Sequence, residues 1–72
     1  MAKLPRAREV VKVVQKLGFR FSRQKGSHAI YRHPDGRRIT VPVHAGKEIS
    51  PGVFREILTD LGITVKEFWE YA

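Results

Sequence analysis

The hydrophobic pattern of this chain changes its period twice, and these two changes constrain the fold more than any other feature. Before Gly18, apolar residues recur every three or four positions, as on one face of an amphipathic helix. From Phe19 to Val43 the period falls to two, which is typical of half-buried strands. After Ser50 the helical spacing returns. The chain has 72 residues, enough for one small core, so we expect residues 1–72 to form a single domain of helix, strands and helices.

The first helix is expected to begin near Pro5, which suits a first helical turn, and to end at Gly18. Its buried face should comprise the apolar residues Leu4, Ala7, Val10, Val11, Val14 and Leu17. Val13 lies at the flank of this stripe, so we expect it to be partly exposed.

Three strands are expected in the middle of the chain, at residues 19–25, 28–33 and 37–43. The segments between them, Gly26-Ser27 and Pro34-Asp35-Gly36, have the composition of tight turns. Two hairpins follow, and together they make a three-stranded antiparallel meander.

The hydrophobic pattern only partly determines which side of each strand faces the core. Phe21 should share the buried side of the first strand with Phe19. Pro42 lacks a backbone donor, which favours an edge position for the third strand. Whether Ile30 or Tyr31 shares a face with the histidine before them stays open, because it depends on the pairing register and on any bulge near the first turn.

Two further helices are expected after this sheet. Ser50 is a good N-cap, Pro51 suits the first helical turn and Gly62 ends the helix. The run from Thr64 to Glu67 has the pattern of a capping box that begins a short last helix. The aromatic residues of that helix should cover the core rather than stack on bases, because acidic neighbours repel phosphate.

The resulting order, α-β-β-β-α with a short C-terminal helix, predicts an α+β fold with a three-stranded antiparallel sheet. Both main helices should lie on one side of the sheet. This is the element order of double-stranded-RNA-binding domains. A domain this small has no room for a large enclosed cavity, so any chemistry should lie on an open face.

Charge is unevenly distributed along the chain. Residues 1–47 contain twelve Lys or Arg against two acids, a net charge of +10, whereas residues 48–72 contain two bases against five acids, a net charge of −3. This asymmetry favours a polyanionic partner, with nucleic acid ahead of an anionic membrane surface or an acidic protein.

Cysteine and apolar content indicate the compartment. The chain has no cysteine, which excludes a disulfide framework and thiolate metal sites. Its N-terminus lacks the apolar region of a signal peptide, and no apolar run approaches the length of a membrane span. We therefore expect a soluble, cytoplasmic protein that does not associate with membranes.

The candidate for chemistry is Gly26-Ser27-His28, where a glycine bend delivers a histidine onto the start of a strand. Imidazole exchanges a proton near neutral pH, and the upstream cations Arg23 and Lys25 are placed to hold a phosphate beside it. The alternative is a surface or hydrogen-bonded structural histidine, which is the commoner role of a lone histidine.

Several segments together resemble the HicA family of small toxins. They are Gly26-Ser27-His28, Tyr31, the run His33-Pro34-Asp35-Gly36-Arg37, Val41-Pro42 with His44, and Ser50-Pro51-Gly52. The resemblance covers nearly the whole chain, and its specificity comes from the placement of the tripeptide between a strand and a hairpin. HicA proteins are mRNA interferases with a double-stranded-RNA-binding-like fold.

The resemblance implies a metal-independent endoribonuclease that cleaves mRNA, with His28 as the catalytic residue, and a cognate HicB-like antitoxin that covers it. No cofactor is implied, because RNA carries its own nucleophile, the 2′-OH group. Residues near His28 in the sequence are expected to bind the RNA and offer charge to the phosphorane: Arg23, Lys25, Ser27, Arg32, Arg37 and Arg38.

Two other histidines have weaker signals. His33 is expected to be a turn residue or a phosphate contact, and His44 is a candidate second acid or base. The spacings of His28, His33 and His44 carry no metal signature, so we expect no metal site.

Two other functions stay open at this point. A non-catalytic RNA-binding module fits the fold and the charge equally well, because binding dominated by phosphate needs no catalytic histidine. A DNA-binding or purely protein-binding role lacks a recognition helix or zinc motif in the sequence.

Overall fold

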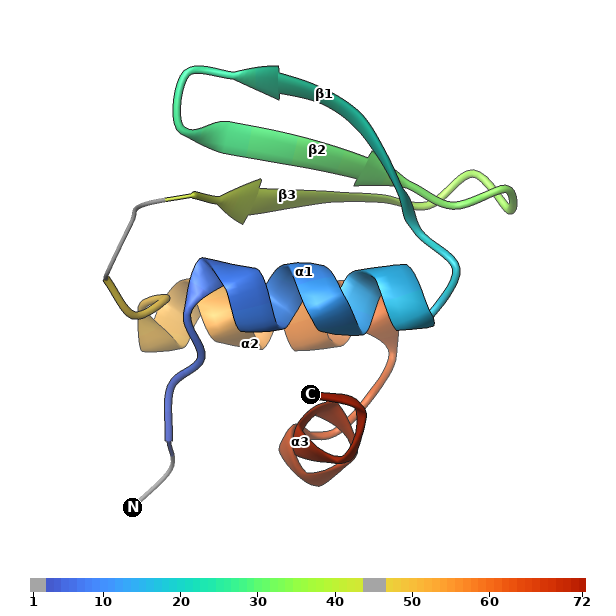
Figure 1. The fold of residues 1–72 in the computed structure, drawn as a ribbon. Helices are drawn as coiled ribbons and strands as arrows, with labels where there is room; N and C mark the ends of the chain where they lie inside the picture. The colour runs from blue at the N-terminus through green and yellow to red at the C-terminus, as the bar shows by residue number, and fades with distance from the viewer. Residues whose placement is uncertain (1–2, 44–46) are drawn as a thin grey trace.

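A computed structural model of the protein describes residues 3–43 and 47–72. Its elements are α1 (Ala7–Lys16), β1 (Arg20–Lys25), β2 (His28–Arg32), β3 (Arg38–Pro42), α2 (Pro51–Leu61) and α3 (Val65–Tyr71). The strands form one antiparallel sheet in the order β1-β2-β3, and α1 and α2 lie together on one side of it (Figure 1). The predicted α+β order, the two hairpins and the edge position of β3 are confirmed.

The first helix begins later than predicted. Arg6 is its N-cap, and Glu9 Oε1 accepts the Arg6 backbone N–H at 2.9 Å. Pro5 is buried before the helix, where its carbonyl accepts the Ile49 N–H at 2.7 Å. The prediction of Pro5 in the first turn is therefore wrong. Pro5 lies before the extended N-cap residue Arg6, and its carbonyl pairs the N-terminal segment with the segment before α2. Val13 is also fully buried rather than partly exposed, because α1 packs against both β3 and α3.

The two sides of the sheet differ sharply. The side toward the helices carries four buried residues of the central and third strands, Ala29, Tyr31, Ile39 and Val41. They alternate with residues that point away from the helices, among them His28, Ile30 and Arg32. The facing of β2 is thus settled: His28 shares a side with Ile30 and not with Tyr31.

The first strand is uncovered. All six residues of β1 are exposed, and in Figure 1 it is the strand farthest from the helices. Phe21 pairs with Tyr31 and packs edge-on against its ring at 5.7 Å, yet it remains 54% exposed. The prediction that Phe21 is buried is wrong, because α1 and α2 pack against β3 at the opposite edge of the sheet.

The C-terminal helices follow their local signals. Ser50 Oγ accepts the Val53 N–H, Gly62 ends α2, and Thr64 and Glu67 form the reciprocal capping box of α3. Phe68 is fully buried and lies edge-on against Phe54 at 4.9 Å. Its neighbour Trp69 is half-buried, and Tyr71 is 37% exposed. The predicted packing role holds for the first two aromatics of α3 and only weakly for the third.

Candidate active site

A tight turn positions the candidate histidine. Lys25 and His28 are directly paired across Gly26 and Ser27, so the loop of this hairpin has two residues. Gly26 has φ +58°, whereas no residue other than glycine has a positive φ among those described. Glycine at the first loop position with a positive φ is the pattern of a type II′ turn, which suits the twist of paired strands. Gly26 is thus part of the turn rather than a bulge within a strand.

Two hydrogen bonds hold this turn in place. Gln24 Nε2 donates to the Gly26 carbonyl at 3.0 Å. The Val43 N–H donates to the Ser27 carbonyl at 2.7 Å, which extends the pairing of β2 with β3 beyond His28. Ser27 itself is half-buried. The backbone of His28 is therefore fixed on both sides, as a proton-transferring residue requires.

The side chain of His28 is free to meet a ligand. It is exposed, and neither ring nitrogen forms a hydrogen bond or an ion pair with any residue of 3–43 or 47–72. A structural histidine would be packed or bonded to its neighbours. Within the described part of the chain, this observation argues against a hydrogen-bonded structural role for His28 and leaves a surface residue as the alternative to catalysis.

The side of the sheet that faces away from the helices has a regular layout, set by the pairing of the three strands. It comprises three rows, which we call together the open face: Lys25, His28 and Pro42; Arg23, Ile30 and Thr40; Arg20, Arg32 and Arg38. Successive rows are about 7 Å apart along a strand. The open face therefore carries five cations and one histidine, and none of its nine residues is acidic.

The structure gathers most of the predicted RNA-binding residues. Arg23, Lys25, Arg32 and Arg38 lie on the open face with His28, and Ser27 lies in the adjoining turn. Arg20 also belongs to this face and was missed. In a regular strand Arg20 and Arg23 point to opposite sides, but an irregularity between Phe21 and Arg23 brings them to the same side. Strand alternation in the sequence does not reveal such a bulge.

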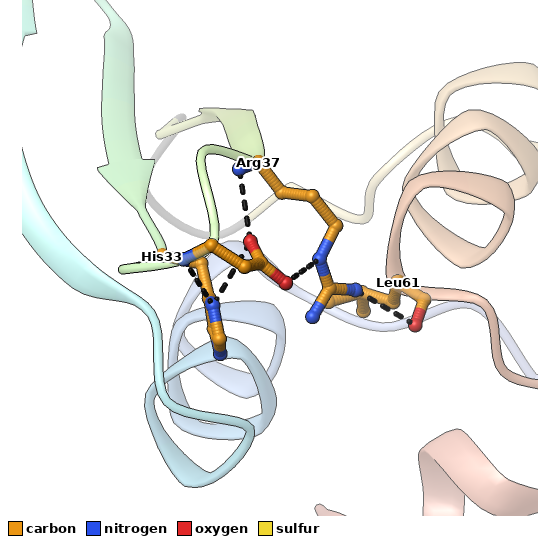
Figure 2. A network of polar contacts seen from close by, with 4 residues as sticks. His33, Arg37 and Leu61 are labelled. Atoms are coloured by element: carbon orange, nitrogen blue, oxygen red, sulfur yellow. Dashed lines mark hydrogen bonds and ion pairs between the residues drawn. The ribbon is translucent and has the colours of Figure 1, made fainter.

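Arg37, the remaining predicted RNA-binding residue, is occupied elsewhere (Figure 2). Its Nε lies 2.8 Å from Asp35 Oδ2, and its backbone N–H donates to Asp35 Oδ1 at 3.0 Å. Its Nη1 reaches the Leu61 carbonyl at the end of α2 at 3.5 Å, and its guanidinium lies 5.1 Å from the centre of the Phe19 ring. These contacts join the turn after β2 to the C-terminus of α2, which is a structural role.

The charge of Asp35 is stabilised by this arrangement. The backbone N–H of Arg37 contributes most and its guanidinium adds to it, so the pKa of Asp35 lies below its ordinary value of 3.8. Asp35 is one of two acids in the first 47 residues, and Arg37 already neutralises it. It therefore gives no compensating charge to the open face.

His33 serves the same turn. Its ring packs edge-on against Phe19 at 5.0 Å, and its Nδ1 accepts the Asp35 N–H at 3.1 Å. The same nitrogen lies 3.0 Å from Asp35 Oδ1, so both the backbone and the side chain of Asp35 lie against this edge of the ring. The prediction of His33 as a turn residue is thus supported by its contacts.

The two described histidines, His28 and His33, do not share a metal site. His28 is the first residue of β2 and His33 follows its last residue, so the two are about 16 Å apart along the chain and cannot share one ion. The third, His44, lies outside the described residues. Among the described residues, no three His, Cys, Asp or Glu side chains are grouped as metal ligands.

A second titratable side chain near the sheet can be placed as well. Burial raises the pKa of Tyr31, so its hydroxyl stays protonated at neutral pH. Its ring lies on the helix side of β2, opposite His28. Tyr31 is therefore part of the core and does not serve as a base on the open face.

No helix within residues 3–43 and 47–72 is long and apolar enough to cross a membrane.

Comparison with known proteins agrees with this geometry. None of the curated proteins matches the chain. A family model for the HicA toxin of bacterial toxin-antitoxin systems matches residues 7–63, which include the whole sheet and both main helices. With that match over well more than half its length, the chain belongs to the HicA toxin family.

Proposed function

We propose that this protein is the toxin of a type II toxin-antitoxin system and acts as a metal-independent endoribonuclease on mRNA, with His28 as its catalytic residue. The observation that carries the proposal is the position of His28: an exposed imidazole with no protein partner among the described residues, at the end of a hairpin, with Lys25 directly opposite and Arg23 in the next row.

The proposed reaction uses the nucleophile of the RNA itself. His28 takes the proton of a ribose 2′-OH, and the oxygen attacks the adjacent phosphorus. A new O2′–P bond forms as the P–O5′ bond breaks, and the leaving O5′ takes a proton from water or from the imidazolium. The products are a 2′,3′-cyclic phosphate and a 5′-OH end. General acid-base catalysis of this kind typically contributes about 10² to 10⁴-fold.

Cations on the open face support the same step. The transition state carries additional negative charge on the phosphoryl oxygens, and fixed positive groups stabilise it. Lys25 is directly opposite His28, and Arg23 lies in the next row. Both are exposed and form no ion pair with a described carboxylate, so their charge is available to RNA.

A non-catalytic RNA-binding module remains the second candidate, because the open face alone would bind RNA phosphates. Incubation of RNA with the protein in the presence of EDTA separates the two. The nuclease produces new 2′,3′-cyclic phosphate and 5′-OH ends, whereas the binding module leaves the RNA intact.

A HicB-like antitoxin is proposed as the partner that restrains this activity. A nuclease site on an open face needs a cover, and a partner with acidic groups there would associate rapidly and lose association rate with added salt. Coexpression with the product of the neighbouring gene should abolish RNA cleavage. Undiminished cleavage in the presence of that product would exclude it as the antitoxin.

A further inference from the structure

Three arginines lie side by side across the whole sheet at the end opposite the histidine. Arg20 is paired with Arg32, and Arg32 with Arg38, so the three occupy one row of the open face. All three side chains are exposed. We call these residues the arginine row.

The arginine row has no acidic partner within residues 3–43 and 47–72. No carboxylate of the described residues lies within ion-pair distance of Arg20, Arg32 or Arg38. Like charges directly opposite each other on neighbouring strands destabilise a sheet. Arg37, next to Arg38 in the sequence, shows the contrast, because it has Asp35 and the Leu61 carbonyl as partners. Stability of the free protein therefore does not account for the row.

An oligonucleotide backbone accounts for it. A guanidinium donates two parallel hydrogen bonds to a phosphate, and three of them in adjacent positions offer a dense donor array. Protein–protein interfaces also use arginine, but they combine it with aromatic and aliphatic side chains at their centre. The only apolar side chains of the open face are Ile30 and Pro42, both half-buried and both outside this row. The chemistry therefore favours RNA over an acidic protein.

The distance from the histidine defines what the arginine row can do. Arg32 and His28 are four residues apart on β2, about 13 Å between their Cα atoms, so the row is set back from the phosphate under attack. Arg23 lies between the two ends on the neighbouring strand. These positions define a path along β1 and β2 from the arginine row to His28.

We propose that Arg20, Arg32 and Arg38 form a remote phosphate-binding subsite, which holds the RNA backbone a few nucleotides away from the scissile bond and aligns a single strand along β2. This inference rests on the proposed function, since it takes RNA as the ligand and His28 as the reacting end. A single strand fits a flat face of three strands, where successive phosphates meet successive rows. The arginine row then contributes binding to long RNA and little to a substrate that covers only the reacting end.

The length of the substrate provides the test. Arg32→Ala removes the centre of the arginine row, and Arg55→Ala removes the same charge from the solvent side of α2. Each variant is assayed on a dinucleotide and on a single-stranded RNA long enough to reach both ends of β2. We expect the ratio of mutant to wild-type KM for Arg32→Ala to be about ten times larger for the long RNA than for the dinucleotide. This is the effect expected when one charge-assisted hydrogen bond to the long RNA is lost. Equal losses on both substrates, or a loss no greater than that of Arg55→Ala, would overturn the proposal.

Binding and stability give readouts that do not depend on cleavage. In a His28→Ala background, Arg32→Ala should weaken the binding of long RNA. It should also reduce, by about 0.7, the magnitude of the slope of the logarithm of the binding constant against the logarithm of the salt concentration. Without RNA it should raise the melting temperature, because it relieves repulsion within the row. A lower melting temperature would assign the row a structural role and contradict the proposal. Weaker antitoxin binding with unchanged RNA binding would contradict it as well, whereas failure of the nuclease function alone would leave the RNA-binding result in place.

Discussion

Lys25 and His28 are directly paired across the Gly26-Ser27 turn, on the side of the sheet that the helices leave open. Neither side chain has a hydrogen-bond or ion-pair partner among the described residues. An ammonium group and an imidazole are thus held side by side at the tip of one hairpin. The proposed reaction requires such a pair, with the imidazole to transfer a proton and the ammonium group to bind the adjacent phosphate.

The first prediction concerns the charge of Lys25. Lys25→Ala should lower kcat/KM for RNA cleavage about threefold to tenfold, because it removes a cation next to the reacting phosphate. The loss should be similar for all RNA sequences, since phosphate contacts carry no base information. Lys66→Ala, which removes the same charge from α3, is the matched control and should leave cleavage unchanged. A loss confined to one RNA sequence would instead indicate that Lys25 reads a base.

The second prediction concerns the turn. Gly26→Ala should lower the free energy of unfolding by about 1–2 kcal/mol, because an L-residue is strained at φ +58°. It should also lower cleavage, since the turn sets the position of His28. Gly52 lies in the first turn of α2 with open space around it, so Gly52→Ala is expected to be neutral or slightly stabilising. Chemical denaturation compares the two variants, and equal stabilities would show that the turn tolerates a side chain at Gly26.

The third prediction concerns acid stability. The pKa of Asp35 is lowered in the folded protein, so its carboxylate stabilises the fold at pH values above the ordinary carboxyl pKa of 3.8. This contribution is lost as the pH falls through the lower pKa of the folded state. The stability difference between the wild type and Asp35→Asn should therefore be constant near neutrality and shrink in acid. Denaturation curves across this pH range measure it, and a difference that grows as the pH falls would contradict the sign of the shift.

The fourth prediction distinguishes the role of His33, which follows β2, from the role of His28, which begins it. His33→Ala removes an edge-on contact with Phe19 and the acceptor for the Asp35 N–H. It should lower the free energy of unfolding by about 1–3 kcal/mol. Cleavage per folded molecule should be largely retained, because His33 is about 16 Å from His28 along β2. A variant that folds as well as the wild type would show that the packing of His33 contributes nothing.

Local signals in the sequence were sufficient for much of this fold. Ser50, Gly62 and the Thr64 capping box mark helix ends through contacts within a few residues, so they could be read directly. The change of period likewise predicted the sheet and its two hairpins. These features depend on neighbours along the chain, which is why the sequence reveals them.

Most differences between the expected and the observed structure involve contacts between segments that are distant in the chain. Val13 is buried because α3 packs on α1, and Phe21 is exposed because no helix covers β1. A bulge in β1 places Arg20 on the open face, and Arg37 contacts Asp35 and the end of α2. Proximity to His28 in the sequence therefore predicted that Arg23, Lys25 and Arg32 share its side of the sheet, and it did not predict the contacts of Arg37.

The most direct test of the central claim is metal-free RNA cleavage by His28→Ala, measured together with RNA binding and thermal unfolding. The side chain of His28 is exposed and has no partner among the described residues, so its removal should leave the melting temperature and the RNA affinity nearly unchanged. The rate of cleavage in EDTA should fall by about 10² or more, because the proton-transferring group is gone. Undiminished cleavage by a folded His28→Ala protein would contradict the account, and His44 would then be the next residue to replace.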